Sequence, residues 1–487
     1  MRISTTQALA AAIGAGLEGE PQTEVGPDVV IDTRKAGPGS LFVAMPGERV
    51  DGHDFTPAAE RAGASAVLAT RTTEARIPHL IVADTRQGLT DLARRAVARE
   101  RSRGMRAIAL TGSSGKTSTK DILAQLLEPA GPTISPVGSF NNEIGVPLTA
   151  CGVDAGTDFL ISEMGARGKG HISWLTSIVP PDVAMVLNVG TAHLGEFGSR
   201  EAIAEAKGEI VEGLGAGGWA VLNAEDHRVA AMASRTRGQI AWFSADGAHS
   251  HPGAGIEVSA RDITADSLQR HSFTLRVRAA GRTTEHPVAL RTMGAHQVAN
   301  AVAAAAAATC CGVEPESVAA SLSAATSRSP WRMELDERDD GLVVVNDCYN
   351  ANPDSMAAAL TALEGVLRAR READPATRGV ALLGDMLELG DSSAGLHRQA
   401  GLQAARAGFD LVLCVGAHAG DLAAGAGEGG AATRIVEPGD AVAATTWTGH
   451  DVVLVKASRA LALETVAQEL LNDAGHGSGT VGEGGRA

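Results

Sequence analysis

Residues 111–118, TGSSGKTS, have the composition of a phosphate-binding loop. The apolar run RAIAL precedes them, and the helix-like stretch KTSTKDILAQLLE begins inside them. The two glycines let the backbone approach phosphate oxygens, and the N–H groups of the loop and helix start can bind them. Lys116 can neutralise β- and γ-phosphate charge, and the Thr117 hydroxyl can reach Mg²⁺. Leu110 replaces the first glycine of a full Walker A motif, and an ordinary glycine–serine turn is the alternative interpretation.

Glu163 and His193 follow two further apolar runs, and both side chains can bind a metal. Glu163 ends the run FLISE, and His193 lies in the glycine-rich segment NVGTAHLGEFGS. Open parallel sheets bind ligands at the carboxyl ends of their strands, so both residues are expected at the phosphate edge. Glu163 is a candidate Mg²⁺ ligand, with a solvated strand-end residue as the alternative. His193 is either a metal ligand or a structural histidine.

Lys207 lies in the stretch SREAIAEAKGEIVEGL, which is typical of a helix capped at Ser199. The apolar stripe of this helix consists of Ile203, Ala206, Ile210 and Leu214. Lys207 borders the stripe, and partial burial lowers the pKa of a lysine and favours the neutral amine. A neutral amine can react with CO₂ to form a carbamate, which binds Mg²⁺ as a carboxylate does. A surface lysine whose stem lies along the stripe is the alternative.

Polar residues in three later segments are candidates for nucleotide contacts. His296 and Asn300 are four residues apart and share one face of the helix predicted for residues 295–312. Arg332 lies in SPWRME near an expected domain junction, and Asp347 follows the apolar run LVVVN before a turn-rich segment. An aspartate there can bind a ribose hydroxyl or a charged partner. Helix packing, capping and turn formation are the alternative interpretations.

Parallel sheets must position these residues, and strand-like runs alternate with helical stretches along the chain. A chain of 487 residues is too long for one hydrophobic core and predicts about three domains. We expect an α/β fold with a small α/β N-terminal domain, a central P-loop-type parallel-sheet ATPase domain and a C-terminal Rossmann-like α/β domain. The expected boundaries are 1–100, 101–326 and 327–472, followed by a disordered tail at 473–487. Alternating polar and apolar residues at 255–290 predict an antiparallel insert.

Composition and charge argue against several classes of function. The net charge of −15 disfavours non-specific nucleic-acid binding, although a local basic pocket can still bind an acidic substrate. No apolar stretch reaches about 18 residues, so no membrane span is expected, and the N-terminus does not resemble a signal peptide. The five cysteines lack metal-ligand spacing, which is typical of reduced thiols in a cytoplasm.

Together these motifs resemble those of the Mur ligase family, the ATP-dependent amide-forming enzymes of peptidoglycan synthesis. The matching segments, in the family's order, are DTRKAGPGSLFVAMPGERVDGHDF, TGSSGKTSTK, SFNNEIGVPLT, EMGARGKGHI, NVGTAHLGEFGS with AKGEI, GAHQVANAVAAAA, NDCYNANPDSM and LGDMLELG. The resemblance covers about residues 25–470, and the family's shortened phosphate loop also lacks the glycine at Leu110. One departure is Ala457, where the most similar family members more often have glycine.

The resemblance implies a role for each candidate residue. It implies ATP contacts at Gly112, Ser113, Ser114, Gly115, Lys116, Thr117, Ser118, Asn300, Arg332 and Asp347. It implies two Mg²⁺ ions held by Thr117, Glu163, His193 and Lys207, the last as a carbamate formed with CO₂. The implied catalytic residues are Lys116, Glu163, His193 and Lys207. The implied substrate contacts are Thr33 and Arg34 near UDP, and Asn141 and Asn142 near the muramoyl group.

Within the family, the stretches NVGTAHLGEFG and VLVKASRA favour the activity that joins D-Ala-D-Ala to UDP-MurNAc-tripeptide. The implied reaction transfers the ATP γ-phosphoryl group to the tripeptide carboxylate, and the dipeptide amine then attacks the acyl phosphate. A cytoplasmic monomer without a nucleic-acid partner is expected. The alternatives are the neighbouring ligase that adds the third amino acid and a nucleotide-binding regulator without ligase chemistry.

Overall fold

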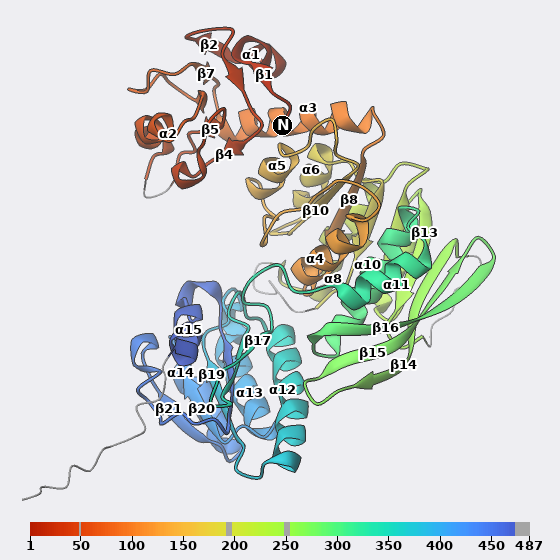
Figure 1. Cartoon of the computed structure of the whole chain (residues 1–487), viewed down its shortest axis with the longest axis vertical. Coiled ribbons are helices and arrows are strands. Elements are labelled where there is room, and N and C mark those ends of the chain that lie inside the picture. The colour runs from red at the N-terminus through yellow and green to blue at the C-terminus, as the bar shows by residue number, and fades with distance from the viewer. Residues whose placement is uncertain (48–49, 191–196, 248–253, 473–487) are drawn as a thin grey trace, which may run out of the picture.

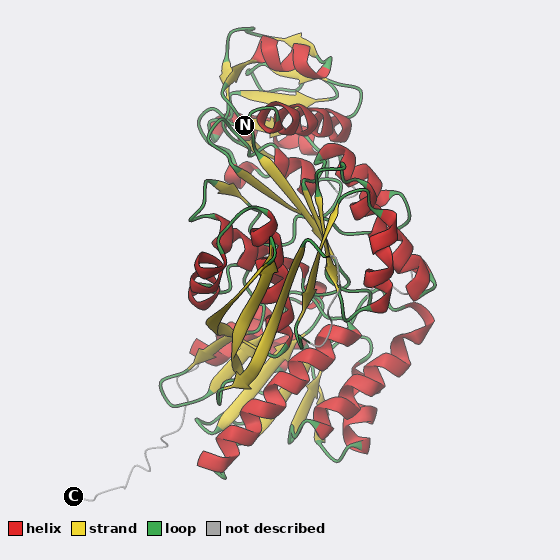
Figure 2. Ribbon diagram, turned by 90° about the vertical axis from the view of Figure 1, so that its right-hand side faces the viewer, coloured by secondary structure: helices red, strands yellow, loops and turns green. Residues whose placement is uncertain are grey.

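The computed structural model describes residues 1–47, 50–190, 197–247 and 254–472 and contains three α/β units, each with its own large sheet. The N-terminal unit lies at the top of Figure 1, the central unit in the middle and the C-terminal unit at the bottom. Figure 2 shows the sheets stacked along the long axis of the molecule, with helices beside them. The expected α/β architecture is confirmed. The expected disordered tail at 473–487 and His193 lie outside the described residues.

The N-terminal unit has a five-stranded sheet in the order β2-β7-β6-β5-β4, parallel except for β2. A two-stranded antiparallel ribbon of β1 and β3 lies beside it. The strands are β1 (Ser4–Thr5), β2 (Gly16–Glu18), β3 (Glu24–Val25), β4 (Val29–Val30), β5 (Leu41–Val43), β6 (Ala66–Ala69) and β7 (His79–Ile81). The helices are α1 (Thr6–Ile13), η1 (Thr33–Lys35), η2 (Gly52–Phe55) and α2 (Thr56–Arg61). The Thr5 hydroxyl caps α1 by accepting the N–H of Ala8.

The long helix α3 (Thr85–Arg101) connects the N-terminal and central units. Asp84 caps its first turn. Its buried side chains, including Leu89 and Val97, belong to one hydrophobic core that continues against the central sheet. The expected boundary at residue 100 falls in the last turn of this helix and stays a prediction.

The central unit has a nine-stranded sheet in the order β16-β15-β14-β13-β12-β11-β8-β10-β9. It is parallel from β9 to β14, and β15 and β16 continue it as antiparallel strands. The strands are β8 (Arg106–Thr111), β9 (Thr133–Ile134), β10 (Phe159–Glu163), β11 (Val183–Val186), β12 (Trp219–Asn223), β13 (Gln239–Ser244), β14 (Ile256–Ala265), β15 (Arg270–Ala279) and β16 (Arg282–Met293). The predicted antiparallel segment is therefore confirmed, as an extension of the parallel sheet.

Helices cover both faces of the central sheet. Apolar side chains of α4, α10 and α11 pack on one face, and those of α5, α6 and α8 pack on the other. The helices are α4 (Lys116–Leu127), α5 (Gly145–Ala150), α6 (His171–Ile178), α8 (Arg200–Glu212), α9 (His227–Ala231), η3 (Met232–Arg235), α10 (His296–Cys310) and α11 (Pro315–Ala324). The alanine-rich helix α10 is almost entirely buried because small side chains let it pack close to the sheet and α4.

The C-terminal unit has a six-stranded sheet in the order β17-β18-β22-β19-β20-β21, parallel except for β17. Helices α12, α13 and α14 pack on one face and α15 on the other. The strands are β17 (Glu334–Glu337), β18 (Val343–Asn346), β19 (Arg378–Leu383), β20 (Leu411–Cys414), β21 (Ala432–Ile435) and β22 (Asp451–Lys456). The helices are α12 (Pro353–Ala373), η4 (Gly390–Ser392), α13 (Ser393–Arg406), α14 (Ala419–Glu428), η5 (Pro438–Asp440), η6 (Arg459–Leu461) and α15 (Glu464–Asn472).

Two further observations concern the cysteine side chains and the length of the apolar helices. All five cysteines are free thiols and buried. Over the described ranges, no helix is both long and apolar enough to cross a membrane.

Candidate active site

The phosphate-binding loop joins β8 to α4 in the order that the sequence predicts. Gly115 precedes the helix with a φ of 78°, a left-handed conformation that favours glycine. A Cβ at this position would lie 2.5 Å from Asn300 Oδ1, so the close approach of α10 also requires glycine. The first residues of α4, Lys116–Ser118, line a cavity beside the loop, where the N–H groups of the helix start can bind an anion.

Asn188, just after β11, holds the phosphate-binding loop in shape. Its Oδ1 accepts hydrogen bonds from the N–H groups of Ser113 and Ser114, each at 3.0 Å. Its Nδ2 donates to the Ser114 carbonyl at 3.2 Å. The loop is thus fixed from a neighbouring strand before any ligand binds.

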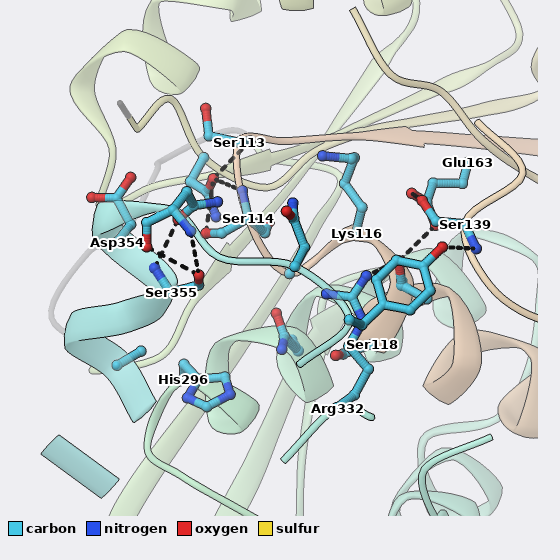
Figure 3. Close-up of a pocket in the computed structure, with 18 of the residues that line it drawn as sticks. Ser113, Ser114, Lys116, Ser118, Ser139, Glu163, His296, Arg332, Asp354 and Ser355 are labelled. Carbon is cyan, nitrogen blue, oxygen red and sulfur yellow. Dashed lines mark hydrogen bonds between the residues drawn. The ribbon is translucent and has the colours of Figure 1, made fainter. Parts of the chain in front are cut away.

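Glu163 ends β10 and is fully buried beside the loop. Its Oε2 accepts a 3.0 Å hydrogen bond from Thr117 Oγ1. Its Oε1 accepts hydrogen bonds from Ser139 Oγ and Asn141 Nδ2, each at 2.7 Å. Figure 3 shows Glu163 and Ser139 on one side of the pocket, with Lys116 between them and Ser114. Glu163 is therefore a buried carboxylate, and the solvated alternative is wrong.

The Glu163 environment suits a divalent cation. Its three donors are neutral, and within the described ranges it makes no ion pair, so the carboxyl group is buried without a directly paired cation. The described residues contain no cluster of three or more histidine, cysteine or acidic side chains that could hold a metal alone. Mg²⁺ needs no such cluster, because one carboxylate, a hydroxyl and phosphate oxygens are enough.

Lys116 lies against the loop that precedes it. Its Nζ donates a 2.7 Å hydrogen bond to the Gly112 carbonyl. Burial lowers the pKa of Lys116, the Glu163 carboxylate opposes this shift, and Arg332 adds to it. A phosphate group in the pocket would supply the negative charge that stabilises the ammonium form.

Arg332 reaches the loop from the segment that leads into the C-terminal unit. Its Nη2 donates a 3.1 Å hydrogen bond to Thr117 Oγ1, and its guanidinium lies 4.2 Å from the centre of the Tyr349 ring. Trp331 and Met333, on either side, have positive φ angles of 60° and 51°. The backbone is therefore held in an uncommon conformation that directs Arg332 toward α4.

Asp347 follows β18 and forms a buried ion pair with Lys456 at the end of β22. Its Oδ1 also accepts the N–H of Met333 at 3.2 Å. Both members of the pair line the cavity. The pair fixes the carboxyl ends of two parallel strands next to the Arg332 segment.

Asn300 and His296 line the same cavity from α10. Asn300 Oδ1 accepts a 3.2 Å hydrogen bond from Thr119 Oγ1, and its Nδ2 donates to Gln297 Oε1 at 3.0 Å. Burial lowers the pKa of His296, so the neutral imidazole is favoured. The predicted shared face of these two residues is confirmed.

A cavity of about 310 Å³ lies between the central and C-terminal units and collects most of the predicted site residues. The predicted residues that line it are Ser113, Ser114, Gly115, Lys116, Thr117, Ser118, Asn141, Asn142, Glu163, Asn300, Arg332 and Asp347. Figure 3 shows Ser113 and Ser114 on the loop and Lys116 and Ser118 from the first turn of α4, with Arg332 and His296 on the lower side of the view. Gly112, Thr33, Arg34 and Lys207 are not among the lining residues.

Lys207 is buried in α8, with only 3% of its surface exposed. The alternative interpretation as a surface lysine is therefore wrong. Burial lowers the pKa of Lys207 well below its usual value, and the charge of Lys116 lowers it further. Among the described residues, no acceptor takes a hydrogen bond from its amine. The neutral amine required for carbamate formation is therefore favoured.

Thr33 and Arg34 lie in η1 of the N-terminal unit, and Arg34 is exposed and paired with Asp32. The next residue, Lys35, has its Nζ 5.8 Å from the centre of the Phe140 ring. Because Phe140 adjoins Asn141, η1 lies near the cavity wall without forming part of it.

Sequence reasoning did not single out Asn188, Ser139, Tyr349 or Lys456. Asn188 and Lys456 each come at or just after the end of an apolar strand, which is the signal that identified Glu163. Ser139 and Tyr349 lie inside segments already noted for their composition, but nothing local predicts their contacts.

A phosphate-binding loop that faces a buried carboxylate, in a cavity between two α/β units, is the arrangement of a nucleotide-dependent enzyme. Three family models match the chain: the Mur ligase family catalytic domain at residues 28–100, the Mur ligase middle domain at 110–308, and the Mur ligase glutamate ligase domain at 331–459. The chain is 40% identical to the UDP-N-acetylmuramoyl-tripeptide–D-alanyl-D-alanine ligase of Mycobacterium tuberculosis, over 91% of this chain and 92% of the relative. The chain belongs to the Mur ligase family and is an ATP-dependent peptide ligase.

Solved structures agree with this membership. A MurF crystal structure from Acinetobacter baumannii matches with a TM-score of 0.80 and 30% identity, over 97% of this chain and 99% of that chain. The MurF ligase of Thermotoga maritima in complex with ADP matches with a TM-score of 0.71 and 28% identity, over 92% of this chain and 97% of that chain.

Proposed function

We propose that this chain joins D-Ala-D-Ala to UDP-MurNAc-tripeptide through an acyl phosphate, giving the UDP-MurNAc-pentapeptide of peptidoglycan synthesis. The observation that carries the proposal is the 40% identity, across 91% of the chain, to a relative named for this reaction. The alternative of a non-catalytic regulator is disfavoured because the buried Glu163, the loop lysine Lys116 and the buried Lys207 are all present.

The three units divide the substrates between them. We assign the UDP moiety to the N-terminal unit near Thr33 and Arg34, because η1 approaches the cavity wall through Lys35 and Phe140. Asn141 and Asn142 then meet the muramoyl part of the substrate, because both line the cavity. ATP occupies the cavity from the phosphate-binding loop toward the C-terminal unit.

Several ATP contacts follow from the lining of the cavity. The triphosphate binds the N–H groups and hydroxyls of residues 112–118, with Lys116 neutralising its charge. Asn300 and His296 flank the nucleotide from α10, and Asp347 and Arg332 approach it from the C-terminal side. The cation–π contact of Arg332 with Tyr349 keeps its guanidinium beside the transferred phosphoryl group.

The residues act by positioning and by charge stabilisation. The tripeptide carboxylate attacks the γ-phosphorus, the bond from that phosphorus to the β,γ-bridging oxygen breaks, and ADP leaves. Lys116 and the loop N–H groups stabilise the charge on the transferring group. Thr117 and Glu163 would hold one Mg²⁺, which would neutralise phosphate charge. The amine of D-Ala-D-Ala then attacks the acyl phosphate, and inorganic phosphate leaves. The cavity between two units excludes water from this labile intermediate.

Lys207 is proposed to act as a carbamate. Its buried amine is neutral and can add to CO₂, which forms an N–C bond and releases one proton. The resulting anion and His193, which lies outside the described residues, would supply ligands for a second Mg²⁺. This role explains why a lysine is buried beside Lys116, where an uncompensated second ammonium would be unfavourable.

The proposed function also includes an oligomeric state, a cellular compartment and a division into domains. We propose a monomer of the cytoplasm, where ATP is available and the five buried thiols stay reduced. The domain boundaries after residues 100 and 326 are proposed to separate the UDP-substrate, ATP and C-terminal domains.

Mass spectrometry of the product tests the proposed function. Purified protein, ATP and Mg²⁺ are incubated with UDP-MurNAc-tripeptide and D-Ala-D-Ala, and the pentapeptide product is expected. A parallel reaction uses UDP-MurNAc-dipeptide with a single diamino acid. A product only in the parallel reaction would instead support the neighbouring ligase that adds the third residue.

A further inference from the structure

Arg167 stands apart from the other cationic groups around the cavity. Within the described ranges, its exposed guanidinium makes no ion pair and no hydrogen bond, although the residue lines the cavity. The other cations are engaged: Lys456 pairs with Asp347, Lys116 bonds to the loop, and Arg332 bonds to Thr117. Arg167 therefore offers an unused positive charge at the cavity rim, on a chain whose net charge is −15.

The backbone of Arg167 is held in place from both sides. Its N–H donates a 3.2 Å hydrogen bond to His171 Nδ1, which leaves the proton on Nε2. That Nε2 lies 3.1 Å from Glu143 Oε1, so the Glu143 carboxylate faces the imidazole. On the other side, the Gly165 N–H donates to the Asn141 carbonyl at 2.8 Å. The segment thus presents the guanidinium from a fixed backbone.

The N–H groups at the start of α6, the helix that follows Arg167, already have an acceptor. Glu209 already accepts the N–H groups of Gly170 and Ser173 at the start of α6, at 2.6 and 2.9 Å. Among the described residues of this rim, the Arg167 side chain is the cationic group still available to an anion, and its planar donors suit a carboxylate.

The position of Arg167 identifies which part of the acceptor it meets. It follows Glu163 by four residues, and Gly165 and Ala166 between them also line the cavity. Under the proposed function, the third residue of the tripeptide carries the reacting carboxylate, which has to lie beside Lys116 and Glu163. The side chain of that residue is then within reach of the wall that Arg167 lines. A third residue with a side-chain ammonium alone would be repelled by the guanidinium, whereas a side-chain carboxylate would bind it.

We infer that Arg167 is a specificity-determining residue that binds a side-chain carboxylate on the third residue of the acceptor peptide, so that the enzyme prefers a diamino diacid to a diamino monoacid there. This inference rests on the proposed function, because it assumes that UDP-MurNAc-tripeptide occupies the cavity. It adds the chemical class of the acceptor to that function.

The test compares two acceptors, UDP-MurNAc-tripeptide ending in diaminopimelate and the same molecule ending in lysine. For Arg167→Ala, kcat/KM with the diaminopimelate acceptor should fall roughly 10- to 100-fold, mainly through KM. With the lysine acceptor it should change less than about 3-fold. Arg167→Lys should keep part of the preference, because it retains a charge but not the planar donors.

Lys169→Ala is the matched control. Lys169 is an exposed cation in the same segment, pairs with Glu205, and is not among the residues that line the cavity. Its removal should leave the ratio of the two kcat/KM values unchanged, which separates a specific contact from a general loss of positive charge. Differential scanning fluorimetry of each variant checks that the fold is retained.

Two results would overturn the inference while leaving the proposed function in place. One is an equal loss with both acceptors, which would mean that Arg167 binds a group common to the two peptides. The other is no loss with either. Absence of turnover by the unmodified enzyme with both acceptors would instead overturn the proposed function, and the inference with it.

Discussion

Thr117 and Glu163 are 46 residues apart in the sequence and meet in a buried 3.0 Å hydrogen bond from the threonine hydroxyl to Glu163 Oε2. The bond joins the first turn of α4 to the end of β10, at the edge where parallel strands end. It places the hydroxyl and the carboxylate so that one cation could bind both.

Replacement of this carboxylate tests its proposed role as a metal ligand. Glu163→Gln keeps the size of the side chain and removes its charge, so kcat should fall roughly 100- to 1000-fold. The Mg²⁺ concentration needed for half-maximal activity should also rise. Steady-state kinetics across a Mg²⁺ titration measures both. Glu201→Gln, at an exposed ion pair with Arg228, should behave like the unmodified enzyme. Activity of Glu163→Gln within about 3-fold of normal would contradict the role.

Carbamate formation on Lys207 makes activity depend on CO₂. Activity should decline in buffers depleted of CO₂ and return when bicarbonate is added, because the carbamate forms reversibly on the neutral amine. Lys207→Ala should be inactive under both conditions. Phosphate release in degassed and bicarbonate-supplemented buffers is the measurement. Full activity of Lys207→Ala would refute the proposal.

Burial of Lys207 also predicts how stability depends on pH when CO₂ is absent. Because its folded pKa is far below the usual 10.5, the unfolded chain binds more protons between the two values. The contribution of this residue to stability therefore rises with pH through that window. Lys207→Met should be more stable than the unmodified protein at neutral pH, and this difference should shrink as the pH approaches 10.5.

Urea unfolding across this pH range measures the difference. Lys35→Met, at an exposed lysine of η1, is the control and should show no comparable trend. A constant stability difference for Lys207→Met at every pH would show that the amine titrates normally in the folded chain.

Replacement of Asn188 should weaken ATP binding more than it slows the catalytic step. Asn188→Ala removes the acceptor for the side-chain hydrogen bonds from the N–H groups of Ser113 and Ser114. The loop then has to become ordered when ATP binds, so the Kd for ATP should rise roughly 5- to 30-fold. Isothermal titration calorimetry measures it, with Asn472→Ala at the end of α15 as the control. An unchanged Kd would mean that the loop is held without Asn188.

The ion pair of Asp347 and Lys456 should stabilise the C-terminal unit. Asp347→Ala leaves Lys456 buried without its carboxylate, which costs about 3–5 kcal/mol of unfolding free energy. Glu428→Ala, which removes a surface pair with Arg398, should leave the denaturation midpoint almost unchanged. Chemical denaturation followed by circular dichroism compares the two. An equal loss of unfolding free energy in the two variants would show that burial of the Asp347–Lys456 pair does not make it more stabilising than a surface pair.

Local sequence patterns predicted most of the fold and the centre of the site. The apolar runs before Thr111, Glu163 and Asp347 gave strands, and Ser199 caps α8 as expected. Strands such as β21 (Ala432–Ile435) were missed because their side chains are mostly exposed and form no buried apolar run.

Contacts between units could not be predicted, because they depend on how the units pack. The Arg332 contact with Thr117 joins residues 215 positions apart, and no local pattern encodes it. The stacking of Arg332 on Tyr349 and the pairing of Asp347 with Lys456 likewise require the folded C-terminal unit. The depth at which Lys207 is buried was underestimated, because its burial depends on tertiary packing around α8.

Phosphate release from ATP tests the central claim most directly. The protein and Mg²⁺ are supplied with UDP-MurNAc-tripeptide alone, D-Ala-D-Ala alone, or both together. We predict sustained phosphate release only with both substrates, with one phosphate released for each dipeptide incorporated. Sustained release with a single amino acid in place of the dipeptide, or no release with any combination, would contradict the account.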